Sequence, residues 1–62
     1  MQTFEIYNMN AGEVLGTYQA KTEDQALDVM ARDYGFRDYA DCLTGYGVDV
    51  ETAKTELQIT VR

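Results

Sequence analysis

The sequence has no histidine and only one cysteine, Cys42, and each scarcity removes a class of structure. With one cysteine no intrachain disulfide can form, although a chain of 62 residues buries only about 60% of its unfolded surface. A zinc site would need carboxylates and a single thiol, an uncommon ligand set. A lone cysteine fits a reducing cytoplasm, and the apolar neighbours of Cys42 indicate a small buried side chain rather than a reactive thiol.

Basic residues are also scarce, with five lysines and arginines against eleven carboxylates and a net charge of −6. This balance argues against direct binding to nucleic acid or to an anionic membrane, because both recruit Lys and Arg. No window approaches the roughly 20 apolar residues that span a bilayer, and the N-terminal segment lacks the pattern of a signal peptide. We expect one cytoplasmic domain over residues 1–62.

Hydrophobic periodicity predicts a β-hairpin followed by a helix. Apolar and polar residues alternate over residues 2–9, and strand-forming types return over residues 13–20 after a turn at residues 10–12. Gly16 interrupts the second strand and indicates a bulge, or a close approach of the helix to the backbone. In residues 22–35, Thr22 and Gln25 form a capping box and Gly35 ends the helix. Its expected core stripe is Ala26, Leu27, Met30, Ala31 and Tyr34.

The second half of the chain predicts a short helix and a last strand. Phe36, Tyr39, Ala40 and Leu43 repeat at helical spacing over residues 36–43, and residues 55–61 alternate as a half-buried strand does. The pattern of residues 48–54 is consistent with either a loop or a short strand beginning at Val48. We therefore predict an α+β fold, a three-stranded antiparallel sheet with the last strand beside the first and the helices on one face.

The net charge is concentrated in one part of the chain. Residues 23–51 contain eight carboxylates against two arginines, and the remaining acids and bases balance one another. Asp24 and Asp28 are four apart, which places their side chains roughly 5–6 Å apart on a helix. Asp28 with Arg32, and Arg37 with Asp41, are also spaced to form ion pairs.

Such a row of carboxylates resembles the charge of a nucleic-acid backbone and would steer a basic groove towards it. Tyrosines lie in the same region, and tyrosine is enriched in interface hot spots. The predicted partner-binding residues are Asp24, Asp28, Asp33, Asp38, Tyr39, Asp41, Tyr46, Asp49 and Glu51. The alternative is that the acids serve solubility and that Tyr34 and Tyr39 are core edges, which leaves glycine-flanked Tyr46 as the tyrosine to expect at the surface.

No motif indicates catalysis. Asp38 and Asp41 could form a carboxylate pair for acid–base chemistry, but no histidine, activated nucleophile or phosphate-binding glycine loop accompanies them. The Asp49–Glu51 segment lacks the dense acidic pattern of a calcium loop. We therefore expect a protein that is not an enzyme and uses no cofactor or metal.

Three pieces of the sequence carry a resemblance. They are Leu15–Tyr18 ("LGTY"), the helix pattern from Thr22 to Asp33, and Gly35–Phe36. Across residues 3–39 the chain resembles a group of small acidic β-β-α-β proteins of bacterial and phage genomes. In size and charge these are similar to anti-CRISPR and anti-restriction inhibitors, several of which mimic DNA. The resemblance supports the fold and carries over no functional residue.

Two functional hypotheses follow. In the first, the protein is an inhibitor that occupies the basic groove of a nucleic-acid-binding protein or complex, such as a CRISPR effector. In the second, it is a housekeeping interaction module that forms a homodimer through the edge of its sheet, since exposed edges accept another strand.

Overall fold

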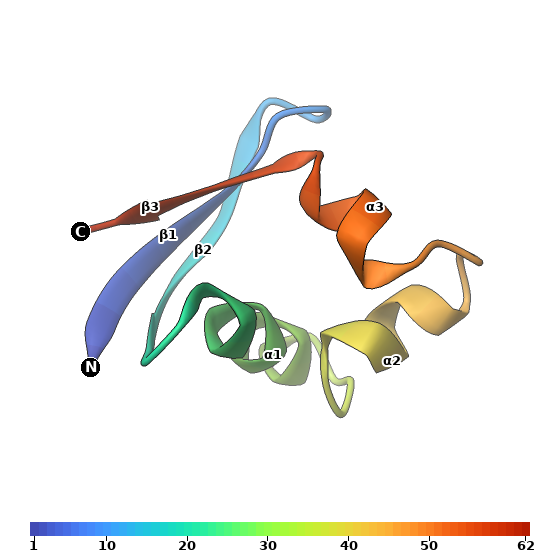
Figure 1. The fold of residues 1–62 in the computed structure, drawn as a ribbon, viewed down its shortest axis with the longest axis horizontal. Coiled ribbons are helices and arrows are strands. Elements are labelled where there is room, and N and C mark those ends of the chain that lie inside the picture. Colours follow the sequence, from blue (N-terminus) through green and yellow to red (C-terminus); the bar gives the residue numbers. More distant parts are fainter.

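A three-stranded antiparallel sheet carries three helices in the computed structural model, which describes residues Met1–Arg62 (Figure 1). The strand order is β2-β1-β3, so the last strand pairs beside the first and the predicted α+β fold is confirmed. In chain order the elements are β1 (Gln2–Asn8), β2 (Glu13–Ala20), α1 (Glu23–Asp33), α2 (Tyr39–Thr44), α3 (Val50–Lys54) and β3 (Leu57–Val61).

The strand register brings the apolar side chains of all three strands onto one face. Phe4 of β1 lies opposite Tyr18 of β2 and Val61 of β3. Ile6 lies opposite Gly16 and Ile59 in the same way. Because successive side chains alternate across a strand, Phe4 and Ile6 share the face that α1 covers, and both are buried.

Gly16 lies at the bulge that the sequence predicted. The β1–β2 register shifts between Ile6 and Tyr7, which gives β2 one extra residue. A Cβ at Gly16 would lie 2.5 Å from the hydroxyl oxygen of Tyr18, so the Tyr18 ring folds over the glycine. The close approach therefore comes from a neighbouring tyrosine and not from the helix.

Helix α1 begins and ends as the sequence predicts. The Oγ1 of Thr22 accepts a hydrogen bond from the Gln25 N–H at 3.1 Å. The Oε1 of Gln25 reaches back one residue further than expected and accepts from the Lys21 N–H at 3.2 Å. At the other end Gly35 takes a φ of +97°, and the Phe36 N–H bonds to the Ala31 carbonyl at 2.9 Å, which completes a Schellman motif.

The predicted core stripe of this helix was wrong at its last member. Ala26, Leu27, Met30 and Ala31 are buried, but Tyr34 is 50% exposed. Tyr34 is the C-cap residue, so it lies where the chain turns away from the helix.

The two short helices depart from the sequence expectation. The helix expected over residues 36–43 begins only at Tyr39, after the N-cap Asp38. Residues Val50–Lys54 form α3, where a loop or a strand was expected. Its N-cap is Asp49, whose Oδ1 accepts from the Thr52 N–H at 2.7 Å. Neither the loop nor the short strand beginning at Val48 forms, because capping by Asp49 directs the chain into a helix.

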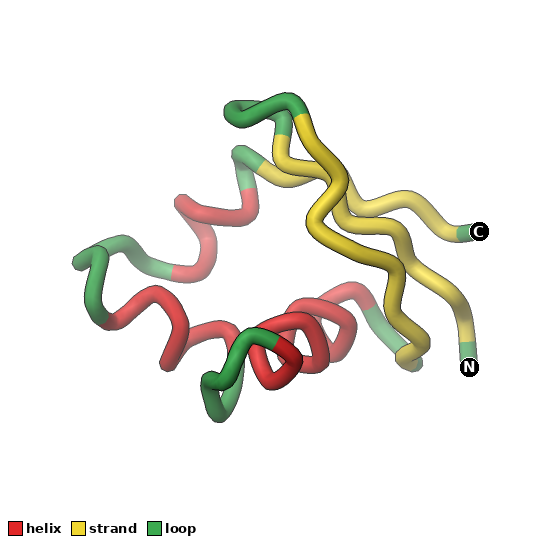
Figure 2. The backbone as a smooth tube through the Cα atoms, turned by 180° about the vertical axis from the view of Figure 1, so that it is seen from behind, coloured by secondary structure: helices red, strands yellow, loops and turns green.

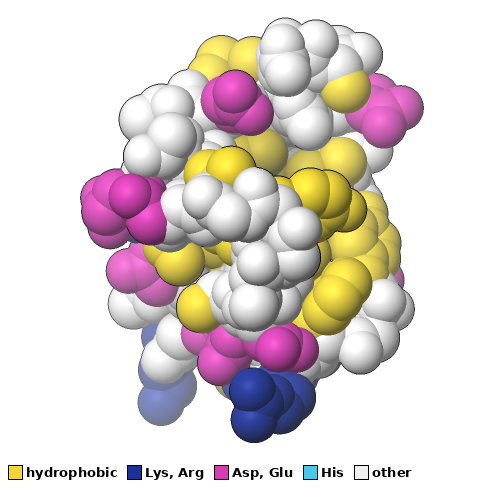
Figure 3. Space-filling view, turned by 90° about the vertical axis from the view of Figure 1, so that its right-hand side faces the viewer, with side chains coloured by type: hydrophobic (Ala, Val, Ile, Leu, Met, Phe, Trp, Pro, Cys, Tyr) yellow, Lys and Arg dark blue, Asp and Glu magenta, His cyan; other side chains and the backbone are white.

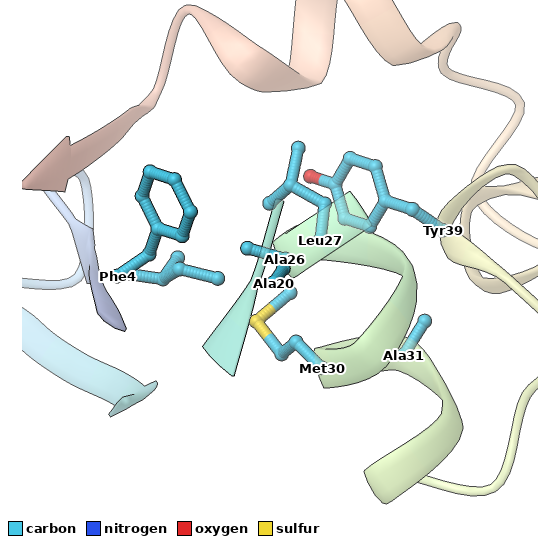
Figure 4. Packing of buried hydrophobic residues seen from close by; sticks show 8 residues of the cluster. Phe4, Ala20, Ala26, Leu27, Met30, Ala31 and Tyr39 are labelled. Atoms are coloured by element: carbon cyan, nitrogen blue, oxygen red, sulfur yellow. The ribbon is translucent and has the colours of Figure 1, made fainter. Parts of the chain in front are cut away.

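The core lies between the sheet and α1, and α2 adds one side chain to it. Figure 4 shows Phe4 from the sheet facing Leu27 and Met30 of α1, with the Tyr39 ring reaching towards Leu27 from the opposite side. Seen from behind, α2 and α3 extend the helical layer beyond the sheet and lead the chain back to β3 (Figure 2). Eight of the 62 residues are buried, so each contributes a large share of the stability.

Replacing Leu27 with alanine should lower the free energy of unfolding by about 3 kcal/mol, because the side chain is fully buried and leaves a cavity. Urea unfolding followed by circular dichroism measures this change. The exposed β2 residue Gln19, changed to alanine as a control, should alter stability by less than about 0.5 kcal/mol. Equal losses in the two variants would contradict this core assignment.

Candidate interaction surface

Four of the predicted carboxylates meet around one shallow groove, which we call the acidic groove. Its volume is about 280 Å³, and it lies between α1, the start of α2 and the start of α3. Its lining residues are Asp24, Leu27, Asp28, Asp38, Tyr39, Ala40, Val50 and Glu51. The structure thus brings together five of the nine residues that the sequence predicted to bind a partner.

Asp24 is held by an ion pair with α3. The Nζ of Lys54 donates to Oδ1 of Asp24 at 2.7 Å, across 30 residues of sequence. This hydrogen bond raises the pKa of Lys54, and the charges of Asp24, Glu51 and Glu23 act in the same direction. The pair connects α1 to α3, and it neutralises part of the charge that the predicted row of phosphate-like carboxylates requires.

Asp28 and Asp38 are held by backbone groups of the second half of the chain. Oδ1 of Asp28 accepts a hydrogen bond from the Tyr39 N–H at 3.0 Å, and Oδ1 of Asp38 accepts from the Asp41 N–H at 2.7 Å. The expected Asp28–Arg32 ion pair does not form, since Arg32 donates instead to the Arg37 carbonyl. Each carboxylate has two oxygens, so the second oxygen of Asp28 and of Asp38 is left for a partner.

Asp49 and Glu51 belong to the start of α3. The Thr52 N–H donates to Asp49, and this backbone hydrogen bond lowers the pKa of the Asp49 carboxyl. Glu51 lies in the first turn and is exposed; it forms no salt bridge. Among the carboxylates of the acidic groove, Glu51 is therefore the one most available to a partner.

Asp33 and Asp41 lie outside the acidic groove. Asp33 accepts from the Tyr18 hydroxyl at 3.2 Å, and burial together with this bond raises the pKa of Tyr18 to about 12. Asp41 accepts from the Arg37 N–H and forms the predicted ion pair with the Arg37 side chain at 3.6 Å. The nine predicted residues therefore do not all line one groove.

Tyr39 is a core residue and not a surface anchor. It is only 7% exposed, because its ring packs beside Leu27, and burial raises the pKa of its hydroxyl. Its expectation as a core edge is confirmed, while its role as a partner-binding side chain stays a prediction. The ring still forms part of the wall of the acidic groove.

Tyr46 is 75% exposed and borders a second groove that the sequence analysis missed. This apolar groove has a volume of about 550 Å³ and lies between the end of α1, α2, α3 and the sheet. Among its lining residues are Leu15, Tyr34, Phe36, Leu43, Tyr46 and Val48. Figure 3, which shows the side that carries α2 and α3, has hydrophobic side chains along one flank with acidic side chains around them.

Phe36 was expected to face the core but is 38% exposed in this groove. The signal that could have found it is Gly35. A left-handed glycine at the end of a helix turns the chain, so the aromatic residues on either side of it leave the helical stripe.

No cluster of three or more metal-binding side chains is present. None of the three helices has the length and hydrophobicity of a transmembrane span. The thiol of Cys42 is partly buried, and burial followed by the charge of Asp41 raises its pKa, which disfavours the reactive thiolate. The chemistry that this surface offers is charge, hydrogen-bond acceptance and apolar contact.

Comparison with family models, with characterised proteins and with solved structures finds no match to this chain.

Changing Asp38 to alanine should remove the N-cap of α2 and lower the free energy of unfolding by about 1 kcal/mol. Changing it to asparagine should restore most of this loss, because asparagine caps helices equally well. Urea unfolding compares the two variants. An alanine variant as stable as the asparagine variant would show that the Asp38–Asp41 hydrogen bond does not stabilise α2.

The lowered pKa of Asp49 predicts a specific acid sensitivity. A carboxyl whose pKa is depressed in the folded state stabilises the protein above its ordinary pKa of about 3.9 and loses this contribution as pH falls through the lowered value. Asp49→Asn keeps a capping side chain but cannot titrate. The difference in melting temperature between wild type and this variant should shrink from pH 7 towards pH 2, and a constant difference would contradict the assignment.

Proposed function

We propose that this protein is a non-enzymatic acidic inhibitor of the kind that phages and mobile elements use, acting by imitation of nucleic-acid charge. Its partner is a basic nucleic-acid-binding protein or complex, with a CRISPR effector as the leading class. The observation that carries the proposal is the convergence of Asp24, Asp28, Asp38 and Glu51 around the acidic groove.

The way these carboxylates are held supports the proposal. Asp28 and Asp38 are oriented by backbone N–H groups and Asp24 by Lys54, so little side-chain freedom would be lost on binding. A carboxylate array with fixed positions presents a stable field, which accelerates encounter with a basic groove and selects against acidic surfaces. Nucleic acid itself would be repelled by the same field.

The cations of the chain add further support, because three of the five are paired with carboxylates. Lys54 pairs with Asp24, Arg37 with Asp41, and Arg62 with Glu5 at 2.6 Å. Arg32 and Lys21 form no ion pair. Five positive charges cannot balance eleven carboxylates, so a partner meets an acidic surface.

Reversing the charge of Glu51 should weaken binding to the partner about tenfold. Glu51 forms no salt bridge, so the fold should lose only the attraction of its charge to Lys54 and to the N-terminus of α3. The measurement is a pull-down with purified CRISPR effector complexes, followed by competition with target DNA at low and at physiological salt. Glu13→Lys is the matched control, because it changes the charge equally on the hairpin, outside the acidic groove. We expect it to weaken binding less than twofold.

The proposal would be wrong if every effector complex still bound its target DNA normally at a saturating concentration of this protein. Equal effects of Glu51→Lys and Glu13→Lys would also count against it, because binding would then depend on net charge and not on the acidic groove.

A homodimer is the second candidate function, and the free edges of the sheet favour it. Strands β2 and β3 each have one unpaired edge, and β3 (Leu57–Val61) contains no charged residue and no proline. Such an edge accepts another strand. Sedimentation at micromolar concentration separates the two candidates: a monomer with salt-sensitive binding to a basic partner supports the inhibitor, and a tight dimer without such a partner supports the interaction module.

A further inference from the structure

The apolar groove holds a large share of the exposed hydrophobic surface of this chain. Eight large hydrophobic side chains are exposed, and four of them line this groove: Tyr34, Phe36, Tyr46 and Val48. The other four are on the sheet strands or the chain end and hairpin beside them. Exposed apolar side chains that gather in one hollow mark an interaction site more often than the same residues scattered singly.

The charges around the apolar groove are mostly negative. No lysine or arginine is among its fourteen lining residues, and Glu56 is its one lining residue with a carboxylate. Five further carboxylates adjoin a lining residue in the sequence: Asp33, Asp38, Asp41, Asp49 and Glu51. Arg37 and Lys54 adjoin lining residues as well, but each is paired with a carboxylate, Arg37 with Asp41 and Lys54 with Asp24. A partner that inserts apolar side chains here therefore meets carboxylates at the rim, and basic flanking residues complement them.

The two grooves share a wall. Tyr39 lines both the acidic groove and the apolar groove, and α2 and α3 contribute residues to each. One extended or helical segment could thus contact both, with basic residues along one part and apolar residues along another.

We infer that the apolar groove binds one or two large apolar side chains from a basic segment of the partner, whose lysines or arginines contact the surrounding carboxylates. This inference rests on the proposed function for the basic character of the partner. Apolar contact in this groove would add to the affinity a contribution that salt does not screen. Salt screens the attraction between exposed charges but not the burial of apolar surface.

A pair of peptides of identical charge tests the inference. The probes are acetylated Lys-Lys-Phe-Phe-Lys-Lys-amide and the same peptide with both phenylalanines replaced by alanine, each titrated into ¹⁵N-labelled protein at about 0.02 M and about 0.3 M salt. We expect the phenylalanine peptide to bind about tenfold more tightly than the alanine peptide at the lower salt concentration and to keep measurable binding at the higher one. It should shift the amide resonances of Tyr34, Phe36, Tyr46 and Val48.

The alanine peptide should shift only resonances near the acidic groove, and these shifts should vanish at the higher salt concentration. Tyr46→Ala should remove most of the advantage of the phenylalanine peptide. Val14→Ala is the control, because Val14 is 53% exposed but lies on β2 outside the groove.

Equal affinity of the two peptides would overturn the inference, and so would phenylalanine-dependent shifts confined to the sheet. Shifts of the groove resonances with protein concentration alone would overturn it too, because a second copy of the chain would then be the occupant. A failure of the proposed function would look different. Glu51→Lys would then leave effector binding unchanged, while the phenylalanine peptide would still bind more tightly than the alanine peptide.

Discussion

The placement of Tyr39 determines how the second half of this chain is organised. Its ring completes the core beside Leu27, and its N–H bonds to Asp28 of α1 at 3.0 Å. Together these contacts place the start of α2 against α1, and both grooves take their shape from that arrangement. In a chain with eight buried residues, one aromatic side chain in this position joins the two halves of the molecule.

The carboxylates show how a small domain combines stability with surface charge. Asp38 and Asp49 cap helices of six and five residues, which are too short to form alone. Asp24 adds a connection between α1 and α3 through Lys54. The same groups give the surface its negative field, so the charge is not an independent layer on the fold. Replacing these carboxylates with alanine would therefore weaken the helices that display them.

The sequence predicted well where several local signals agreed. Thr22 and Gly35 bound a helix whose apolar spacing is regular. Alternation predicted the last strand, and the helical connection that returns the chain to the sheet placed it beside the first, as observed. Prediction failed at two places. Residues 48–54 were left between a loop and a strand because the cap at Asp49 was not recognised, and the helical spacing of Tyr34 continued past the point where the chain turns. The positions of the acidic residues along the sequence identified candidate residues. Which of them converge depends on where Tyr39 packs, and a tertiary contact of this kind cannot be read from local patterns.

The ends of the chain lie together, far from both grooves. The Arg62 N–H bonds to the Thr3 carbonyl at 2.7 Å, and the Arg62 side chain pairs with Glu5. Figures 1 and 2 place both termini on the opposite side of the molecule from α2 and α3. A tag, a fluorophore or a surface tether attached at either end would therefore leave the grooves facing solution, so immobilised protein would present a single orientation to whatever flows past it.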